Sequence, residues 1–474
     1  MGALQSIDRR ESGSGFPSLR DAGPDGGTMA RQGKSLTAGQ SLVVGITLFS
    51  MFFGAGNLIL PPLLGYQAGT ASVPAALGFL ATGIGLPVCG VVSCALVGDL
   101  DRLAGRVHPA FAYAFAILIY LAIGPCLAIP RTSSTAFEMA LPLLEAAMGG
   151  KPSDGLVFGA RMAFSIAFFV VAAVLALRPN KLTRLLGRVT GPALLVLIVI
   201  VVVSAIAAPL GTPAAPVAPY DKVPAVQGFI TGYQTMDVLA SLTFGIVIAQ
   251  NIRGLGVGEP AAVAREVVKS GLVMGVLMAL VYCGTAYVGT VLGPQAGAVA
   301  NGATVLTASA SGHFGFAGTV IIAVIFLLAC LNVCIGLLSC CGAFFHERFE
   351  RVPYPVWVVA FALFSCVVSN AGLDAILAFS VPLLNALYPV AIVLVLMGMA
   401  HGLVDRVPFA WAWVAWTAAV VSVATSLRDA LVPGMWLPFD ALPLADLGFN
   451  WVVPVVVAAI VGIAHSKIAG TGAE

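Results

Sequence analysis

Two glycines and an amide interrupt the first long apolar stretch of the chain, in the sequence FGAGN at 53–57, and two prolines follow a turn later. In a helix interior, Gly costs about 1 kcal/mol and Pro about 3 kcal/mol relative to Ala. Gly54 and Gly56 stand two residues apart and point to different faces, which favours an unwound backbone over a packing stripe of small residues. Unwound backbone in a membrane exposes carbonyls that bind a cation and half-helix amides that bind an anion, and Asn57 adds a neutral oxygen. We therefore expect a site for small charged groups at this break.

A second break is expected in the stretch FITGYQTMDVLASLTFGIVIAQNI at 229–252. Transporters built on one broken helix usually have another in a repeat of inverted topology. The second stretch is the fifth apolar stretch after the first. Because five is odd, the set of helices that begins with it enters the membrane from the opposite side. A carboxylate near a helix centre costs about 2.5 to 3.5 kcal/mol on insertion scales, so Asp237 is either a functional group inside the membrane or a solvated structural group at an outer vestibule. The small and polar residues at mid-depth are Gly232, Asp237, Ser241, Thr243 and Gly245.

The elements that must position these breaks are transmembrane helices. Of the 474 residues, 59% are apolar and 9% are charged, and the mean hydropathy is +1.01, whereas a soluble domain carries about 25% charge. The apolar stretches run about 18 to 25 residues, as needed to cross a hydrocarbon core, and they lack the alternation of a membrane β-barrel. We expect an all-α membrane protein with twelve helices, near 41–65, 73–97, 109–132, 157–178, 188–209, 227–251, 266–291, 316–345, 355–371, 375–399, 408–427 and 449–467.

The distribution of basic residues predicts the orientation. Twelve helices place both termini on one side, and if that side is cytoplasmic, 18 Lys and Arg residues lie inside and five lie outside, in agreement with the positive-inside rule. We expect a disordered polar tail at 1–36, in which Met29 looks like a natural start, and a short helix within the outer loop 293–315. The expected units are one transmembrane domain at 37–468, with repeats at about 41–209 and 227–399 and two further helices at about 408–467, and a tail at 469–474.

Five strings of the sequence resemble one known family, the bacterial branched-chain amino acid:cation symporters of the LIVCS or BrnQ type. They occur in family order from about 40 to 468: FFGAGNLILPPLLGYQAG, AIPRTSSTAFE, GFITGYQTMDVLASLTFGIVI, VVSNAGL and SVPLLNALYPV. The resemblance implies a LeuT-type 5+5 inverted repeat plus two extra helices, within the wider amino acid–polyamine–cation superfamily. It also implies import of leucine, isoleucine and valine across the bacterial inner membrane, with co-transported Na⁺ or H⁺ and no other cofactor.

The resemblance also assigns backbone groups at the first break. It implies that the Ser50 and Phe53 carbonyls form a Na⁺ site with the Ala329 carbonyl, and that the Phe52 carbonyl and Asn57 serve a second ion or water. The amides of the segment Gly54, Ala55, Gly56 and Asn57 would meet the substrate carboxylate.

The sequence departs from the family pattern beside this cation site. Two adjacent hydroxyl residues are expected there, and the chain has Asn332 and Val333 instead. Val333 cannot coordinate an ion, whereas Asn332 offers an amide oxygen. Proton coupling and a rebuilt Na⁺ site both remain open on the sequence.

Three further groups carry weaker expectations. Tyr120, Gly124 and Pro125, with Ser241, Leu242 and Phe244, would form an apolar cavity for an aliphatic side chain, with ordinary bundle packing as the alternative. Arg131 and Glu138 would form an outer gate, or Arg131 is an interfacial residue that reaches the headgroups. These residues do not predict a preference among leucine, isoleucine and valine, because one methylene group changes the binding free energy by only about 1 to 3 kcal/mol.

Other functional classes fit the sequence less well. Motifs of intramembrane hydrolases and paired intramembrane carboxylates are absent from it, and GTMARQGKS at 27–35 has the wrong spacing and context for a nucleotide-binding loop. A channel needs a continuous polar stripe or a repeated filter. We therefore expect a secondary symporter with an amino acid as substrate, the lipid bilayer as surroundings and no nucleic-acid partner. A carrier of another small neutral amino acid or solute is the alternative, and the sequence does not indicate the oligomeric state.

Overall fold

The first long apolar stretch forms two helices rather than one in the computed structural model, which describes residues 35–178, 181–235, 237–293 and 301–470. Helix α1 (Ala38–Phe52) begins with a capping box, in which the Thr37 hydroxyl accepts from the Gln40 amide at 3.3 Å. Phe53 (φ −76°, ψ 89°) and Gly54 (φ −113°, ψ −164°) leave the helical conformation, and α2 (Ala55–Ala68) follows. The break predicted at 53–57 is confirmed.

The second predicted break is also present. Helix α11 (Pro224–Tyr233) and helix α12 (Asp237–Gly254) are bent by 44° relative to each other. Asp237 therefore stands at the positive end of a half-helix, where backbone amides have no partner inside the helix. The two broken helices contribute the backbone groups from which the candidate site is built.

The rest of the described chain forms helices joined by loops such as 208–223, and the described residues contain no β-strand. Three helices contain a π-helical turn, at Ala81–Gly85, Ala122–Cys126 and Leu186–Thr190. In the second of these turns the helix kinks at Gly124 (φ −89°, ψ −126°), directly before Pro125, as expected where proline removes a helical donor. The other long elements are α3 (Ser72–Leu80), η2 (Ala81–Gly85), α4 (Leu86–Val97), α6 (Pro109–Leu121), η3 (Ala122–Cys126), α7 (Ala128–Met148), α8 (Asp154–Ala176), η5 (Leu186–Thr190), α10 (Gly191–Ala207), α13 (Pro260–Leu292), α15 (Phe316–Arg348), α16 (Tyr354–Ser369), α17 (Leu373–Met399), α19 (Phe409–Leu431) and α20 (Val452–Ile468).

Eight helices of the described residues are long and apolar enough to cross a membrane, and the bent pair α11–α12 would make nine. One of the eight, Ala55–Val97, joins the second half of the first broken helix to the next helix, and three shorter apolar helices are counted apart. The number of twelve spans therefore stays a prediction. The short helix expected in 293–315 is present as α14 (Gly302–Phe314), whereas the expected tails lie almost wholly outside the described residues.

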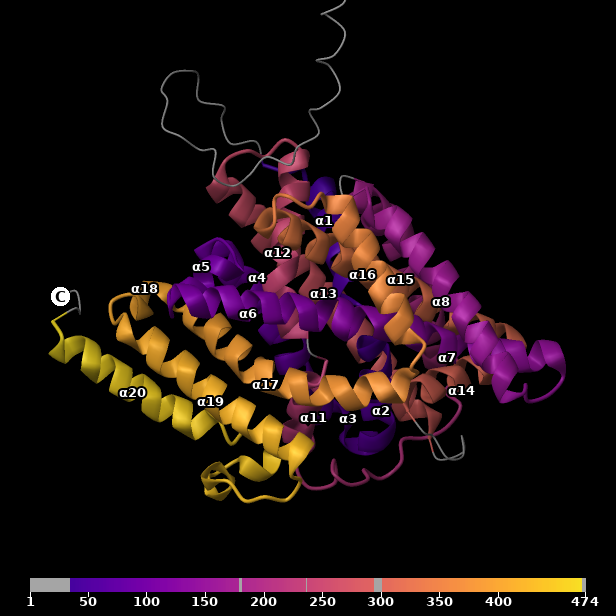
Figure 1. Ribbon diagram of the computed structural model, residues 1–474. Coiled ribbons are helices and arrows are strands. Elements are labelled where there is room, and N and C mark those ends of the chain that lie inside the picture. Colours follow the sequence, from indigo (N-terminus) through magenta and orange to yellow (C-terminus); the bar gives the residue numbers. More distant parts are fainter. Residues whose placement is uncertain (1–34, 179–180, 236, 294–300, 471–474) are drawn as a thin grey trace, which may run out of the picture.

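Burial follows the arrangement of a bundle in lipid. Figure 1 shows α20 along one margin of the bundle, beyond α19, and α8 along the opposite margin. Apolar side chains on these marginal helices are more than half exposed, such as Val170 (57%) and Ile460 (63%), whereas Phe49 of α1 is fully buried. Exposed apolar side chains of this kind are expected on surfaces that face hydrocarbon.

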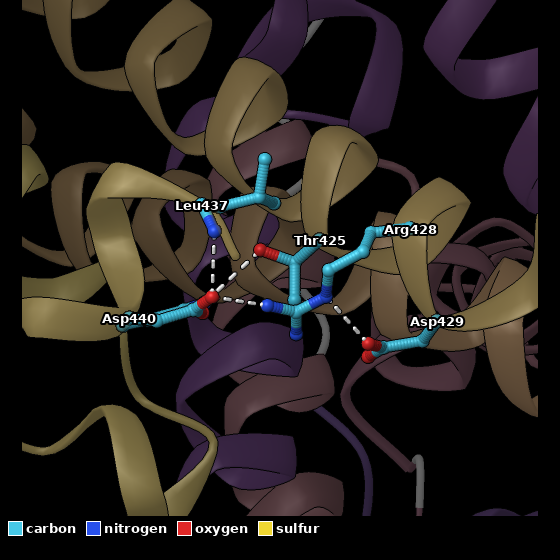
Figure 2. A network of polar contacts seen from close by, with 6 residues as sticks. Thr425, Arg428, Asp429, Leu437 and Asp440 are labelled. Atoms are coloured by element: carbon cyan, nitrogen blue, oxygen red, sulfur yellow. Dashed lines mark hydrogen bonds and ion pairs between the residues drawn. The ribbon is translucent and has the colours of Figure 1, made fainter. Parts of the chain in front are cut away.

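The loop at 432–451, between α19 and α20, is fixed to the end of α19 (Figure 2). Asp440 accepts from the Arg428 guanidinium at 2.5 Å and from the Leu437 amide at 2.8 Å, and Arg428 also binds Asp429 at 2.8 Å. The Leu437 amide and the Arg428 guanidinium hold the pKa of the Asp440 carboxyl below its usual value. At the end of this loop, Phe449 packs edge-on against Tyr233 of α11 with ring centroids 5.5 Å apart, so the loop contacts the first half of the second broken helix.

Candidate functional site

The first break leaves the first three amides of α2, and the Gly54 amide before them, outside any helical hydrogen-bond ladder. The Phe53 amide donates to the Phe49 carbonyl at 2.8 Å, and the next bond of helical type runs from the Leu58 amide to the Gly54 carbonyl at 3.2 Å. The amides of Ala55, Gly56 and Asn57 lie between these bonds, at the N-terminus of α2. Such amides, at the positive end of a helix dipole, bind anions.

Open space lies beside these amides. A methyl group placed on Gly56 would meet no heavy atom within 4 Å, and Gly56 is partly exposed although its neighbours in the chain are buried. A methyl group on Gly54, in contrast, would lie 3.1 Å from Cγ2 of Val333. One side of the break is thus accessible, and the other is closed by α15.

Asn57 connects the two breaks directly. Its side-chain nitrogen donates to the Phe52 carbonyl at 3.2 Å and to the Asp237 carboxylate at 2.9 Å. The Phe52 carbonyl, expected to face a second ion or water, is therefore bonded to Asn57 in this structure. A single amide thus ties the end of α1 to the start of α12, 180 residues further along the chain.

Asp237 lies inside the protein, since only 6% of the residue is exposed. The Tyr282 hydroxyl of α13 donates to the carboxylate over 3.5 Å, and Arg131 of α7 interacts with it electrostatically. This burial contradicts the alternative of a solvated group at an outer vestibule. A buried carboxylate that faces a helix break is by default a functional group.

The expected cation site has a mixed outcome. Ser50, whose carbonyl was assigned to it, lies next to the break, and its hydroxyl donates to the Ile46 carbonyl at 2.8 Å. Ala329 and Asn332 of α15 are fully buried, and neither polar atom of the Asn332 side chain has a partner among the described residues. A buried amide without partners costs about 1 to 3 kcal/mol, which makes Asn332 a good candidate to hold an ion or a water.

The expected aliphatic cavity is only partly assembled. Phe244 of α12 packs edge-on against Phe52 with centroids 4.9 Å apart, and the Tyr120 hydroxyl lies 3.5 Å from the Thr243 carbonyl. Phe344 stacks on Tyr120 at 3.9 Å, a contact with no signal in the sequence. Leu242 of α12 is buried as well.

Ser241 differs from the expectation because it faces away from the first break. Its hydroxyl donates to the Val238 carbonyl at 2.6 Å, and a methyl group placed on Gly90 of α4 would overlap it. Ser241 therefore packs between helices, which is the alternative that the sequence left open. Gly124 and Pro125 form the kink described above, where a methyl group on Gly124 would lie 2.6 Å from Sγ of Cys341.

The expected gate pair is not formed. Glu138 accepts from Arg161 of α8 at 3.1 Å, and Arg131 interacts electrostatically with Asp237 instead. Arg161 is one of the five basic residues that the sequence placed outside, and it lies about two turns inside α8. Arg131 thus belongs with the group around the second break, whereas Glu138 belongs with the packing of α7 on α8.

A helical membrane protein with two broken helices, joined at their breaks, has the architecture of a LeuT-type secondary transporter. Two solved transporters share this fold. A mutant of the manganese transporter of Eremococcus coleocola aligns with a TM-score of 0.56 at 14% identity, over 90% of this chain and 94% of its own. Mhp1, of the nucleobase-cation-symport-1 family, aligns with a TM-score of 0.56 at 12% identity, over 90% and 92%. At such identities the likeness concerns the fold alone.

Closer relatives define the family. The family model for branched-chain amino acid transport proteins matches residues 37–469. A branched-chain amino acid transport system 2 carrier protein of Pseudomonas aeruginosa is 37% identical, over 91% of this chain and 97% of its own. The permease BraB of Bacillus subtilis is 35% identical, over 90% and 96%. The chain belongs to the family of branched-chain amino acid transport proteins. The resemblance, the LeuT-type fold and the prediction of a transporter rather than an enzyme are confirmed.

Proposed function

We propose that this protein imports leucine, isoleucine and valine together with a cation, through the site at its two breaks. The observation that carries the proposal is the 2.9 Å contact between Asn57 and Asp237, because it unites half-helix amides and a buried carboxylate in one place. The names of the relatives support the substrate class. The basic residues on one side support an inner-membrane location with both termini in the cytoplasm.

The charged part of the amino acid would bind to the unwound backbone at the first break. Its carboxylate would accept from the amides of Ala55, Gly56 and Asn57, on the open side next to Gly56. Its aliphatic part would then lie toward the aromatic rings of Phe244 and Tyr120, which are both buried. An aliphatic group needs dry surface of the right shape, so little specificity is expected among the three substrates.

Two groups are candidates for the coupled cation. Asn332 would supply an amide oxygen beside the carbonyls of Ser50, Phe53 and Ala329, which are ligands suited to Na⁺. Asp237 would instead carry H⁺, since it is a buried carboxylate in contact with Asn57 and Tyr282. Either cation would organise the break before the amino acid docks, and rocking of the helices that carry the breaks would then open the site to the cytoplasm.

Counterflow in proteoliposomes tests the proposal. The purified protein is reconstituted with unlabelled leucine inside, and uptake of labelled leucine is followed without a gradient and then with an imposed Na⁺ or H⁺ gradient. The proposal predicts exchange without a gradient and accumulation above equilibrium with one of the two cations. Absence of exchange with leucine, isoleucine and valine, in protein that binds none of them, contradicts the substrate class.

A further inference from the structure

A groove on the lipid-facing surface lies outside the transport site. It is formed by α19, α20 and the loop at 432–451, and its volume is about 460 Å³. Its walls include Phe409, Trp413, Trp416 and Val420 of α19, Phe439 of the loop and Pro454 of α20. Trp416 is 51% exposed and Val420 is 60% exposed, and both helices lie at the margin of the bundle (Figure 1).

The dimensions of the groove suit a hydrocarbon chain. The lining residues of α19 run from Phe409 to Val421, which corresponds to roughly 18 Å along a helix. This is more than half of the roughly 30 Å hydrocarbon core of a bilayer. A single acyl chain of a membrane lipid has the apolar character and the extended shape that the groove requires.

His465 lies at one end of the groove, and its hydrogen bond defines which ring nitrogen carries the hydrogen. The His465 ring stacks on Phe409 with centroids 4.2 Å apart, and its Nδ1 accepts from the Trp413 indole at 3.2 Å. Because an indole N–H can only donate, Nδ1 of His465 carries no hydrogen, and a neutral ring has its hydrogen on Nε2. His465 can therefore donate one hydrogen bond at the end of the groove, at the level where Trp residues meet headgroups.

The charges near this end are positive. Arg406 stands three residues before Phe409, Lys467 stands two residues after His465, and both side chains are exposed. Asp405, the carboxylate next to Arg406 in the chain, is bonded to the Arg106 guanidinium and accepts from the Trp411 indole at 3.2 Å. Basic residues at the cytoplasmic ends of transmembrane helices attract anionic lipids.

We propose that the α19–α20 groove binds one anionic phospholipid of the inner leaflet. One acyl chain lies along Trp416 and Val420, the phosphate accepts from Nε2 of His465, and Arg406 and Lys467 neutralise the headgroup. This site is independent of the substrate and of the coupled cation.

Native mass spectrometry of the purified full chain tests this proposal, with phosphatidylglycerol and phosphatidylcholine of the same acyl chains as probes. We expect one phosphatidylglycerol to be retained about tenfold more strongly than phosphatidylcholine, as two cations near the headgroup allow. Thr417→Trp, which fills the groove, should abolish retention of both lipids. The double variant Arg406→Gln and Lys467→Gln should lose the preference but keep a lipid.

A matched control is Val457→Trp, at an exposed position of α20 that does not line the groove. It should retain phosphatidylglycerol like the original chain, and thermal unfolding shows whether each variant is folded. Equal retention of the two lipids by the original chain overturns the proposal. Unchanged retention of lipid by Thr417→Trp also overturns it. A third contradictory result is a dimer that Thr417→Trp converts to monomers without loss of lipid, because a second copy of the chain would then occupy the groove.

Discussion

Asn57 and Asp237 determine, at the scale of residues, what the site can do. The Asn57 amide donates to both the Phe52 carbonyl and the Asp237 carboxylate, so a change in the charge of Asp237 is felt directly at the first break. In the proposed mechanism, the open side of Gly56 would give a substrate carboxylate access to the backbone amides of Ala55, Gly56 and Asn57. A carboxylate in this place can link the binding of a cation to the binding of the amino acid.

Asp237→Asn tests this link. The variant keeps the shape of the side chain but cannot carry a proton or a negative charge. We expect counterflow of labelled leucine to persist, because exchange needs no coupling, whereas accumulation driven by a cation gradient is lost.

Glu266→Gln is the matched control for Asp237→Asn. Glu266 is also a buried carboxylate, 2% exposed, but it binds Ser41 and Lys269 away from the breaks. Its amide variant should keep gradient-driven accumulation. Accumulation by Asp237→Asn equal to that of the original chain would remove the carboxylate from the coupling mechanism.

Val333→Ser tests the candidate Na⁺ site. Val333 packs against Gly54, and a hydroxyl in its place would add a ligand beside the break. A hydrogen bond or ligand to a charged group contributes about 1.5 to 3 kcal/mol, so we expect the Na⁺ concentration for half-maximal uptake to fall by about tenfold. Val333→Ala, which makes the same room without a ligand, should not increase the affinity for Na⁺. An equal response of the two variants would argue against a cation at this position.

At the scale of elements, the breaks could be predicted because glycine and a buried charge are costly in a membrane helix. Gly54 leaves the helical conformation where the sequence placed the break, and Asp237 begins α12 where the second break was expected. The rotation of each helix could not be predicted in the same way. Ser241 faces α4, and Glu138 binds Arg161. The sequence does not indicate these contacts, because a small or polar residue can face any of several neighbouring helices, and the packing of the bundle determines which one.

The attachment of the loop at 432–451 has a predictable dependence on pH. The lowered pKa of Asp440 means that the folded loop favours the carboxylate. Its contribution is fully present above the usual Asp pKa of about 3.9 and is lost as pH falls through the lower pKa of the folded state. Hydrogen–deuterium exchange of the loop, corrected for intrinsic rates, should be constant from pH 7 to about 4.5 and rise in more acidic solution.

Asp440→Asn should remove this dependence on pH and raise exchange in the loop at neutral pH. Asp446→Asn, in the same loop, serves as the control and should behave like the original chain. A rise in exchange at acidic pH that is identical in all three proteins would show that Asp440 does not control the attachment of the loop.

At the scale of the whole molecule, apolar length and basic residues predicted the class, and the motifs predicted the family. A family match over 37–469 and the fold of two solved transporters agree with that reading. The number of spans was less predictable, because broken and bent helices divide the chain differently from apolar stretches. The lipid-facing groove was not predictable either, since its walls come from α19, α20 and a loop whose course depends on the Arg428–Asp440 contact.

Counterflow of labelled leucine by Gly56→Leu tests the central claim most directly. The Cβ of a leucine at this position would enter the open space beside the amides of α2 without meeting a heavy atom within 4 Å, and the rest of the side chain would occupy the proposed substrate site. Gly39→Leu is the matched control, because Gly39 of α1 has equally open surroundings but lies far from the break. With both variants folded and present in equal amounts, we predict that exchange is abolished in Gly56→Leu and retained in Gly39→Leu. Undiminished exchange by Gly56→Leu would contradict a substrate site at the first break.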